Sequence, residues 1–263
     1  MSEPAPFRRE RVGAIMRLRF QRPAALNALD EAGARAFRDA ALAVAADPTI
    51  RCVLIEGEGR AFMAGGDISA FAPGSGGEAE AAAALIGPLH EGILTLRGQD
   101  APLVAAVQGA AAGAGMSLAM ACDLVVAADD ARFISAYSSI GASPDGSSTF
   151  FLPRLVGQRR AMEIALLNRP IPADEALALG LVTRVVPAAD LAAAAMDLAE
   201  KLAAGPTRAY GAVRRLFDQS FGASLAEQLD AERRSFMACA RTHDFVEGCT
   251  AFLEKREPRF DGR

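Results

Sequence analysis

The sequence is poor in the residues that build metal sites, disulfide frameworks and nucleic-acid surfaces. Its 263 residues include no tryptophan, two histidines and four cysteines. The cysteines show no C-x-x-C spacing and have no neighbouring histidine, so they indicate neither a zinc site nor a disulfide framework, and we expect no metal. The formal net charge of −4 and the scattered basic residues argue against a nucleic-acid partner.

Targeting and membrane segments are also missing from the pattern. The first residues, MSEPAPFRRE, lack the apolar stretch of a signal peptide and the pattern of a transit peptide, so we expect a cytoplasmic protein. The uncharged run from Ala101 to Cys122 has the length of a membrane span. It consists mainly of Ala and Gly, has acidic borders at Asp100 and Asp123, and contains Pro102. We therefore interpret it as buried core and expect no membrane partner.

Apolar periodicity predicts alternating strands and helices over most of the chain. Asp30 is suited to cap a helix that runs to about Ala46, because its carboxylate accepts hydrogen bonds from N–H groups of the first turn. Alternation of strands and helices implies a layered α/β core. The predicted strands are Val12–Phe20, Ile50–Ile55, Pro102–Val107 and Asp123–Ala127, and the predicted helices are Glu78–Arg97 and one that starts near Ser148.

The C-terminal part of the chain is mostly helical in pattern, after a short strand predicted at Leu181–Val186. We divide the chain into a core, residues 1–190, and a C-terminal helical region, residues 191–263. The apolar faces of this helical region predict a homo-oligomer, because such faces are usually covered by a neighbouring subunit.

The stretch from Pro102 to Phe133 predicts a strand, a glycine loop, a helix and a second strand, with no basic residue before Arg132. The first N–H groups of a helix lack partners within the helix and lie at the positive end of its dipole. A buried helix start can therefore hold a developing negative charge. This pattern indicates an enzyme that stabilises an oxyanion.

A set of segments carries a family pattern in chain order. They are RPAALNAL (22–29), FMAGGDI (62–68), AAVQGAAAGAGMSLAMACD (105–123), ARF (131–133), LPRLVG (152–157) and EGCTAFLEKREPRF (247–260). Together they resemble the crotonase family, which is the enoyl-CoA hydratase/isomerase superfamily. The resemblance covers nearly the whole chain, from about Val12 onward.

This resemblance implies an α/β fold, a crotonase-like spiral of ββα repeats with a C-terminal helical subdomain, and trimers or dimers of trimers. It implies an acyl-CoA thioester substrate, in which coenzyme A is part of the substrate and no separate cofactor is needed. By position, the amides of Gly66 and Ala114 would hold the thioester oxygen. The residues that would line coenzyme A are Ala25, Leu26, Ala64, Asp67, Ile68, Phe252 and Lys255.

The chain departs from the hydratases of this family at the two glutamates that handle water, where the resemblance places Ser117 and Tyr137. Neither residue is a carboxylate base, so we expect no two-glutamate hydration and little effect of Ser117→Ala. Asp145, in SPDGSS, falls where other members have a catalytic aspartate. Its Pro-Asp pair, the GAG loop, FLPRLVG and AFLEKREPRF are most similar to ring 1,2-epoxyphenylacetyl-CoA isomerases. That branch implies isomerisation of an enoyl-CoA or ring-epoxide acyl-CoA, with Asp145 as acid and base.

Alternative functions stay open at this point. Asp145 lies in a Pro-Asp-Gly sequence and is also suited to be a turn or helix-cap residue. The 4-chlorobenzoyl-CoA dehalogenases of the family combine an aspartate at this position with a histidine base and a tryptophan, where this chain has His90 and Tyr137. Weak hydration by Asp145 alone, and a non-catalytic CoA- or RNA-binding protein, are the remaining alternatives.

Overall fold

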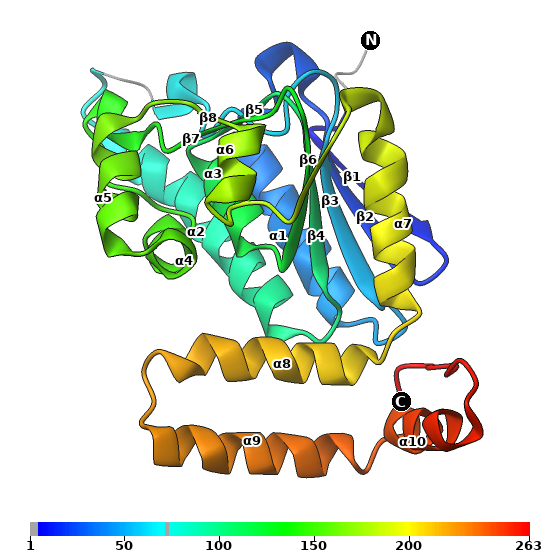
Figure 1. Cartoon of the computed structure of the whole chain (residues 1–263). Coiled ribbons are helices and arrows are strands. Elements are labelled where there is room, and N and C mark those ends of the chain that lie inside the picture. Colours follow the sequence, from blue (N-terminus) through cyan, green and yellow to red (C-terminus); the bar gives the residue numbers. More distant parts are fainter. Residues whose placement is uncertain (1–4, 72–73) are drawn as a thin grey trace.

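The computed structural model describes residues 5–71 and 74–263, which form a layered α/β core and a C-terminal helical arm (Figure 1). A six-stranded sheet in the order β1-β2-β3-β4-β6-β9 runs through the core, and a three-stranded sheet in the order β5-β7-β8 lies beside it. The pairs β1–β2 and β7–β8 are antiparallel, and the other pairs are parallel. The strands are β1 Phe7–Val12, β2 Ile15–Phe20, β3 Cys52–Gly57, β4 Leu103–Val107, β5 Ala110–Ala112, β6 Leu124–Ala128, β7 Arg132–Ile134, β8 Ile171–Pro172 and β9 Arg184–Val186.

From β4 to β7, successive strands alternate between the two sheets, and each pair of strands is followed by a helix. Strand β4 lies in the large sheet and β5 in the small one, before α3 (Ala114–Ala121), and β6, β7 and α4 (Ser148–Val156) repeat this order. Strand β3 is followed by a parallel bridge from Met63 to Ala111 of β5, and then by α2 (Glu78–Gly98). These repeats confirm the spiral of ββα units.

Helices cover both faces of the large sheet. On one face, α1 (Glu31–Ala45) and α2 pack on each other and on the apolar core, and the Asp30 carboxylate caps α1 by accepting from the Gly33 amide, as predicted. On the other face lies α7 (Leu191–Ala203), which packs on β3, β4 and β6 (Figure 1). Helix α7, the first helix of the region 191–263, thus packs on the layered core. The other core helices are α5 Gln158–Leu167 and α6 Ala173–Ala178.

One local prediction is wrong at its boundary, and another is confirmed. The strand expected at Val12–Phe20 is the end of β1 and all of β2, joined by a turn, because the charged sequence FRRERV forms an edge strand with mostly exposed side chains. The uncharged run from Ala101 to Cys122 divides into β4, β5 and α3. Among the residues that the structure describes, no helix is long and apolar enough to cross a membrane.

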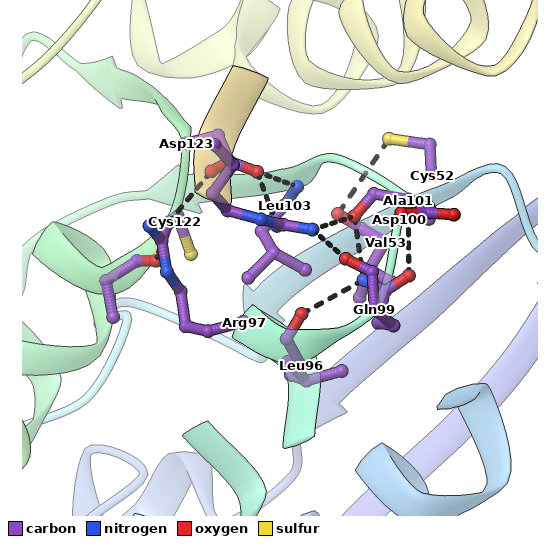
Figure 2. A network of polar contacts seen from close by, with 12 residues as sticks. Cys52, Val53, Leu96, Arg97, Gln99, Asp100, Ala101, Leu103, Cys122 and Asp123 are labelled. Atoms are coloured by element: carbon purple, nitrogen blue, oxygen red, sulfur yellow. Dashed lines mark hydrogen bonds and ion pairs between the residues drawn. The ribbon is translucent and has the colours of Figure 1, made fainter. Parts of the chain in front are cut away.

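The C-terminal arm is attached to the core by a network of ion pairs. The arm consists of α8 Thr207–Ser220, α9 Leu225–Cys239 and α10 His243–Glu254. Arg97 of α2 donates to Asp123 over 2.9 Å and to Asp218 of α8 over 2.6 Å, and the buried Arg214 of α8 donates to Asp123 over 2.9 Å. Figure 2 shows Arg97 and the Leu103 amide converging on the Asp123 carboxylate. The network joins α8 to α2 and to the start of β4 and β6.

Candidate active site

The two segments that carry the Gly66 and Ala114 amides meet at Met63 and Ala111. The Met63 amide donates to the Ala110 carbonyl over 3.1 Å, and the Ala112 amide donates to the Met63 carbonyl over 2.9 Å. Gly66 and Ala114 each lie three residues beyond the parallel Met63–Ala111 bridge, on the two segments that this bridge brings together. Within residues 5–71 and 74–263, neither of their amides donates a hydrogen bond to another atom of the chain.

The backbone at Gly113 aims the first amide of α3 at this site. Gly113 has φ 50° and ψ −119°, a conformation that is open to glycine and costly for other residues. All eight residues of α3 are buried, so the positive end of its dipole acts in a low-dielectric environment. The Gly66 and Ala114 amides are therefore suited to stabilise an oxyanion.

Asp145 is held by a hydroxyl that comes from the preceding short helix. The Tyr137 hydroxyl, at the start of η3 (Tyr137–Ile140), donates to Asp145 Oδ1 over 2.5 Å. Burial, and then the negative charge of Asp145, raise the pKa of Tyr137 well above its ordinary value, so its hydroxyl stays a neutral donor. Among the described residues, Asp145 Oδ2 has no hydrogen-bond partner, which leaves this oxygen available to take a proton.

Tyr137 and Ser117 connect Asp145 to the start of α3. The Tyr137 Cζ atom lies 3.9 Å from the position that a Cβ would take on Gly113. The Ser117 Oγ atom, on the first turns of α3, lies 3.0 Å from the Tyr137 hydroxyl and 3.1 Å from the Gly113 carbonyl. The carboxylate therefore lies next to the helix start that carries the Ala114 amide.

His90 also reaches the Asp145 loop. Its ring, on α2, is half-buried, and Nε2 accepts a hydrogen bond from the Gly146 amide over 3.0 Å. An accepting Nε2 places the proton of the neutral ring on Nδ1. The structure thus brings together the predicted residues Asp145, Tyr137 and His90, although they come from three separate segments.

The residues expected to line coenzyme A fall into two groups. One group is contiguous: the Ala64 amide donates to the Leu26 carbonyl over 3.0 Å, next to Ala25 at the end of η1 (Pro23–Ala25), and Asp67 and Ile68 follow directly. Hydrogen bonds from Ser69 and then from Arg22 lower the pKa of Asp67. Its charge is thus engaged by the loop itself.

Phe252 and Lys255 form the second group and lie elsewhere. Both are exposed, with Phe252 at 83% of its surface, near the end of α10. Figure 1 shows α10 at the opposite end of the molecule from β5 and the start of α3. Within one copy of the chain, these two residues are not brought to the site.

Two site features were missed at the sequence level. The first is Phe71, whose Cζ atom lies 3.1 Å from the position that a Cβ would take on Gly66, so this ring packs against Gly66. The second is the Gly146 amide. The glycine directly after Asp145 could have indicated it, because φ at Gly146 is +58°, a conformation that favours glycine. Both depend on contacts between loops, which spacing along the chain does not reveal.

One group of potential metal ligands occurs among the described residues: His243, Asp244 and Asp261. Asp244 accepts from the amides of Asp261 and Gly262, and Asp261 pairs with Arg263. These carboxylates fasten the C-terminal tail to α10, and their oxygens are already used. The three residues therefore serve to hold the C-terminal tail against α10, and they do not form an open metal site.

Two cavities at the C-terminal arm lie away from Asp145 and from the Gly66 and Ala114 amides. One, of about 920 Å³, is lined by α1, α8 and the C-terminal tail, and the other, of about 490 Å³, lies between α8 and α9. Neither is lined by Asp145 or the two amides. Cavity size alone would thus point to the junction between arm and core rather than to the site with the chemistry.

Comparison with known proteins identifies relatives along the whole chain. The family model for enoyl-CoA hydratase/isomerase matches residues 10–263. The chain is 36% identical to 1,2-epoxyphenylacetyl-CoA isomerase of Escherichia coli (strain K12), over 95% of each protein, and 32% identical to 4-chlorobenzoyl coenzyme A dehalogenase-2 of Arthrobacter sp, over 94% of the chain and 90% of the relative. The crystal structure of an enoyl-CoA hydratase from Polaromonas sp. JS666 is 36% identical and superposes with a TM-score of 0.91, covering 96% of this chain and 98% of that one. Relatives named for three reactions share the fold, so the residues of the site must distinguish between these reactions.

Proposed function

The chain belongs to the enoyl-CoA hydratase/isomerase family and has the crotonase fold, and we propose that it isomerises an enoyl-CoA or ring-epoxide acyl-CoA. Asp145 is the acid and base in this proposal, and the Gly66 and Ala114 amides hold the thioester oxygen. Coenzyme A is part of the substrate, and the reaction needs no separate cofactor or metal. The single observation that supports it most is that, within residues 5–71 and 74–263, neither Asp145 Oδ2 nor the first amide of the adjacent helix α3 has a hydrogen-bond partner.

The proposed reaction moves one proton. For a 3-enoyl-CoA, Asp145 Oδ2 removes a proton from C2, and the electrons of the C2–H bond move onto the thioester oxygen to give a dienolate. Two amides that point at this oxygen stabilise its charge more than they stabilise the neutral carbonyl. The protonated Asp145 then gives the proton to C4, and the double bond ends between C2 and C3. No water is consumed.

The partners of Asp145 favour a shift of one proton over hydration. Ser117 and Tyr137 stand where the family's hydratases have glutamates, and neither side chain can act as a second carboxylate. Tyr137 occupies Oδ1 with its proton, so it fixes which carboxylate oxygen faces the substrate. One acid–base group that serves two carbons is sufficient for an allylic isomerisation.

The test is isomerisation of a 3-enoyl-CoA to its 2-enoyl isomer by purified variants. We expect Asp145→Asn to lower kcat by about 1000-fold or more, because the amide cannot take up the proton. The matched control is Asp39→Asn, on the exposed surface of α1, which should keep the wild-type rate. An Asp145→Asn variant that folds and isomerises at the wild-type rate would refute the proposal.

Hydrolytic dehalogenation of an aroyl-CoA is the second candidate, because the structure places His90 at the residue that follows Asp145. Chloride release from 4-chlorobenzoyl-CoA tests it directly. Addition of water to a 2-enoyl-CoA tests hydration by Asp145 alone, and a filter-binding titration with RNA at increasing salt tests the non-catalytic alternative.

We further propose a homo-trimer or a dimer of trimers built through the arm. Large apolar side chains are exposed on α8, α9, α10 and the loop that joins α8 to α9, which is unusual for a surface that faces water only. In such an assembly, Phe252 and Lys255 of one copy would be available to coenzyme A bound by another. The most exposed of these apolar residues are Phe217, Phe221, Leu225, Phe236, Phe252 and Leu253. Light scattering coupled to size-exclusion chromatography measures the assembly.

A further inference from the structure

The peptide bond that follows Asp145 is held at both of its polar atoms by side chains. Ser117 Oγ lies within hydrogen-bond distance of two carbonyl oxygens, that of Asp145 at 3.0 Å and that of Gly113 at 3.1 Å, and the Asp145 carbonyl also accepts from the Ser148 amide over 3.0 Å. His90 Nε2 accepts from the Gly146 amide over 3.0 Å. The Asp145 carbonyl and the Gly146 N–H belong to one planar unit and point in opposite directions in a trans peptide. The two side chains therefore contact opposite edges of the same peptide unit.

The two side chains come from helices that are independent of the loop. Ser117 lies on α3 and is fully buried, and His90 lies on α2, 56 residues before Gly146 in the chain. Since α2 and α3 belong to the packed core, they give the peptide plane a fixed frame of reference. A loop alone would not provide such a frame, because loops are the mobile parts of a fold.

Gly146 is shaped for this grip. Its φ of +58° lies in the left-handed region, and a Cβ on it would approach the Ser117 Cβ to 3.0 Å, which is closer than ordinary contacts. A side chain at this position would push the plane away from Ser117. The tight fit indicates that the orientation of the plane is specified and is not a by-product of the turn.

We propose that His90 and Ser117 are positioning residues that clamp the Asp145–Gly146 peptide and so aim the Asp145 carboxylate. The inference rests on the proposed function, in which Asp145 is the acid and base. The orientation of the plane sets the direction in which the Asp145 side chain leaves the backbone, and Tyr137 then fixes Oδ1. Misplacement of a catalytic group by about 1 Å is enough to lower a rate about 100-fold.

The clamp also assigns His90 a task that differs from that of a base. Its Nε2 lone pair is occupied by the Gly146 N–H, so this nitrogen is not available to take a proton from water. It further revises the expectation that Ser117→Ala has little effect, because the alanine would leave the Asp145 carbonyl without this donor.

The deciding experiment compares His90→Leu with His90→Gln in the isomerisation assay. Leucine fills similar space but cannot accept a hydrogen bond, whereas the glutamine carbonyl can take the place of Nε2 as an acceptor. We expect His90→Leu to lower kcat by roughly 10- to 100-fold with KM changed less than about threefold, because the contacts to the acyl-CoA are elsewhere. We expect His90→Gln to restore kcat to within about threefold of wild type, since it restores the acceptor. The neighbouring Glu91→Gln, on the exposed side of α2, is the control and should leave both constants unchanged.

The outcomes separate the clamp from the proposed function. An unchanged kcat in a folded His90→Leu variant would overturn the clamp. Equal losses of kcat in His90→Leu and His90→Gln would also overturn it, because they point to proton transfer by His90. If Asp145→Asn is active in the same assay, the proposed function fails, whatever the result at His90. If His90→Leu does not fold, the Ser117→Ala variant decides. We expect it to lower kcat by about 10-fold, because one hydrogen bond is lost, and a wild-type kcat would overturn the clamp.

Discussion

Gly115, in the first turn of α3, provides a test of the two-amide site that removes none of the proposed catalytic groups. A Cβ at this position would lie 2.2 Å from the Met63 carbonyl oxygen and 2.8 Å from the Met63 Cβ. The nearest obstacle is backbone, so it cannot turn aside as a flexible side chain would. In Gly115→Ala, α3 must therefore move away from the Met63 segment by about 1 Å to reach an ordinary contact.

This displacement separates the two halves of the oxyanion site. Ala114 moves with α3, while Gly66 lies three residues beyond Met63 on the opposing segment. A shift of about 1 Å changes a hydrogen bond of ordinary length into a poor one, and loss of one oxyanion donor costs about 100- to 1000-fold in kcat. We expect Gly115→Ala to lower kcat by at least about 100-fold. Overpacking should also cost about 1–3 kcal/mol of stability, which lowers Tm by roughly 3–9 °C.

The assay measures kcat for isomerisation of a 3-enoyl-CoA, with Tm from the same preparation. Gly98→Ala is the matched control, because Gly98 is the exposed last residue of α2 and has nothing within 4 Å of an added Cβ. It should keep the wild-type kcat and gain slightly in stability from the higher helix propensity of alanine. A folded Gly115→Ala variant with kcat within about threefold of wild type would show that the paired amides do not carry the reaction.

Three further predictions follow from contacts of single side chains. Tyr137→Phe removes the donor to Asp145 Oδ1, a charge-assisted bond of about 1.5–3 kcal/mol, so kcat should fall about 10- to 100-fold, and an unchanged kcat would contradict this role. Asp123→Asn leaves the buried Arg214 without its charge partner, so urea denaturation should show a free energy of unfolding lower by about 3–5 kcal/mol, and a change below about 1 kcal/mol would argue against the network. Burial raises the pKa of Cys52 to about 12, above its unfolded value of 9.0, so its contribution to stability is complete below pH 9 and lost as the pH rises toward 12. Urea midpoints of wild type and Cys52→Ala, compared from pH 8 to 11, should converge as the pH rises, and a constant difference would contradict the assignment.

Local signals along the chain were sufficient for most of the core elements. The capping carboxylate of Asp30 and the apolar period after it gave α1 to within a residue at each end. Buried strands β3, β4 and β6 were visible as short apolar runs, because both of their faces are covered by helices. Strand β1 was missed, since its side chains are mostly charged and exposed. Its place in the sheet is decided by pairing with β2, which is a property of two segments.

The candidate site shows the same division between local and long-range information. The resemblance to the family assigned the amides of Gly66 and Ala114 by position, within two glycine-rich motifs, and this assignment stays a prediction. What brings their two segments together is the bridge between Met63 and Ala111, 48 residues apart by their numbers.

The hold on Asp145 depends entirely on long-range contacts. Ser117 and His90 are 28 and 56 residues from their partners in the loop, and whether they reach the same peptide depends on the packing of α2 and α3. From the sequence, Ser117 could be interpreted only as a serine at a position where the hydratases of the family have a glutamate. Such a comparison shows which group is absent, and it does not show what the serine contacts. The contact of the Ser117 hydroxyl with the Asp145 carbonyl is visible only in the packed structure. Isomerisation by one carboxylate requires that this carboxylate reach two carbons from one position, so a site that has lost the glutamates places a higher demand on the orientation of Asp145.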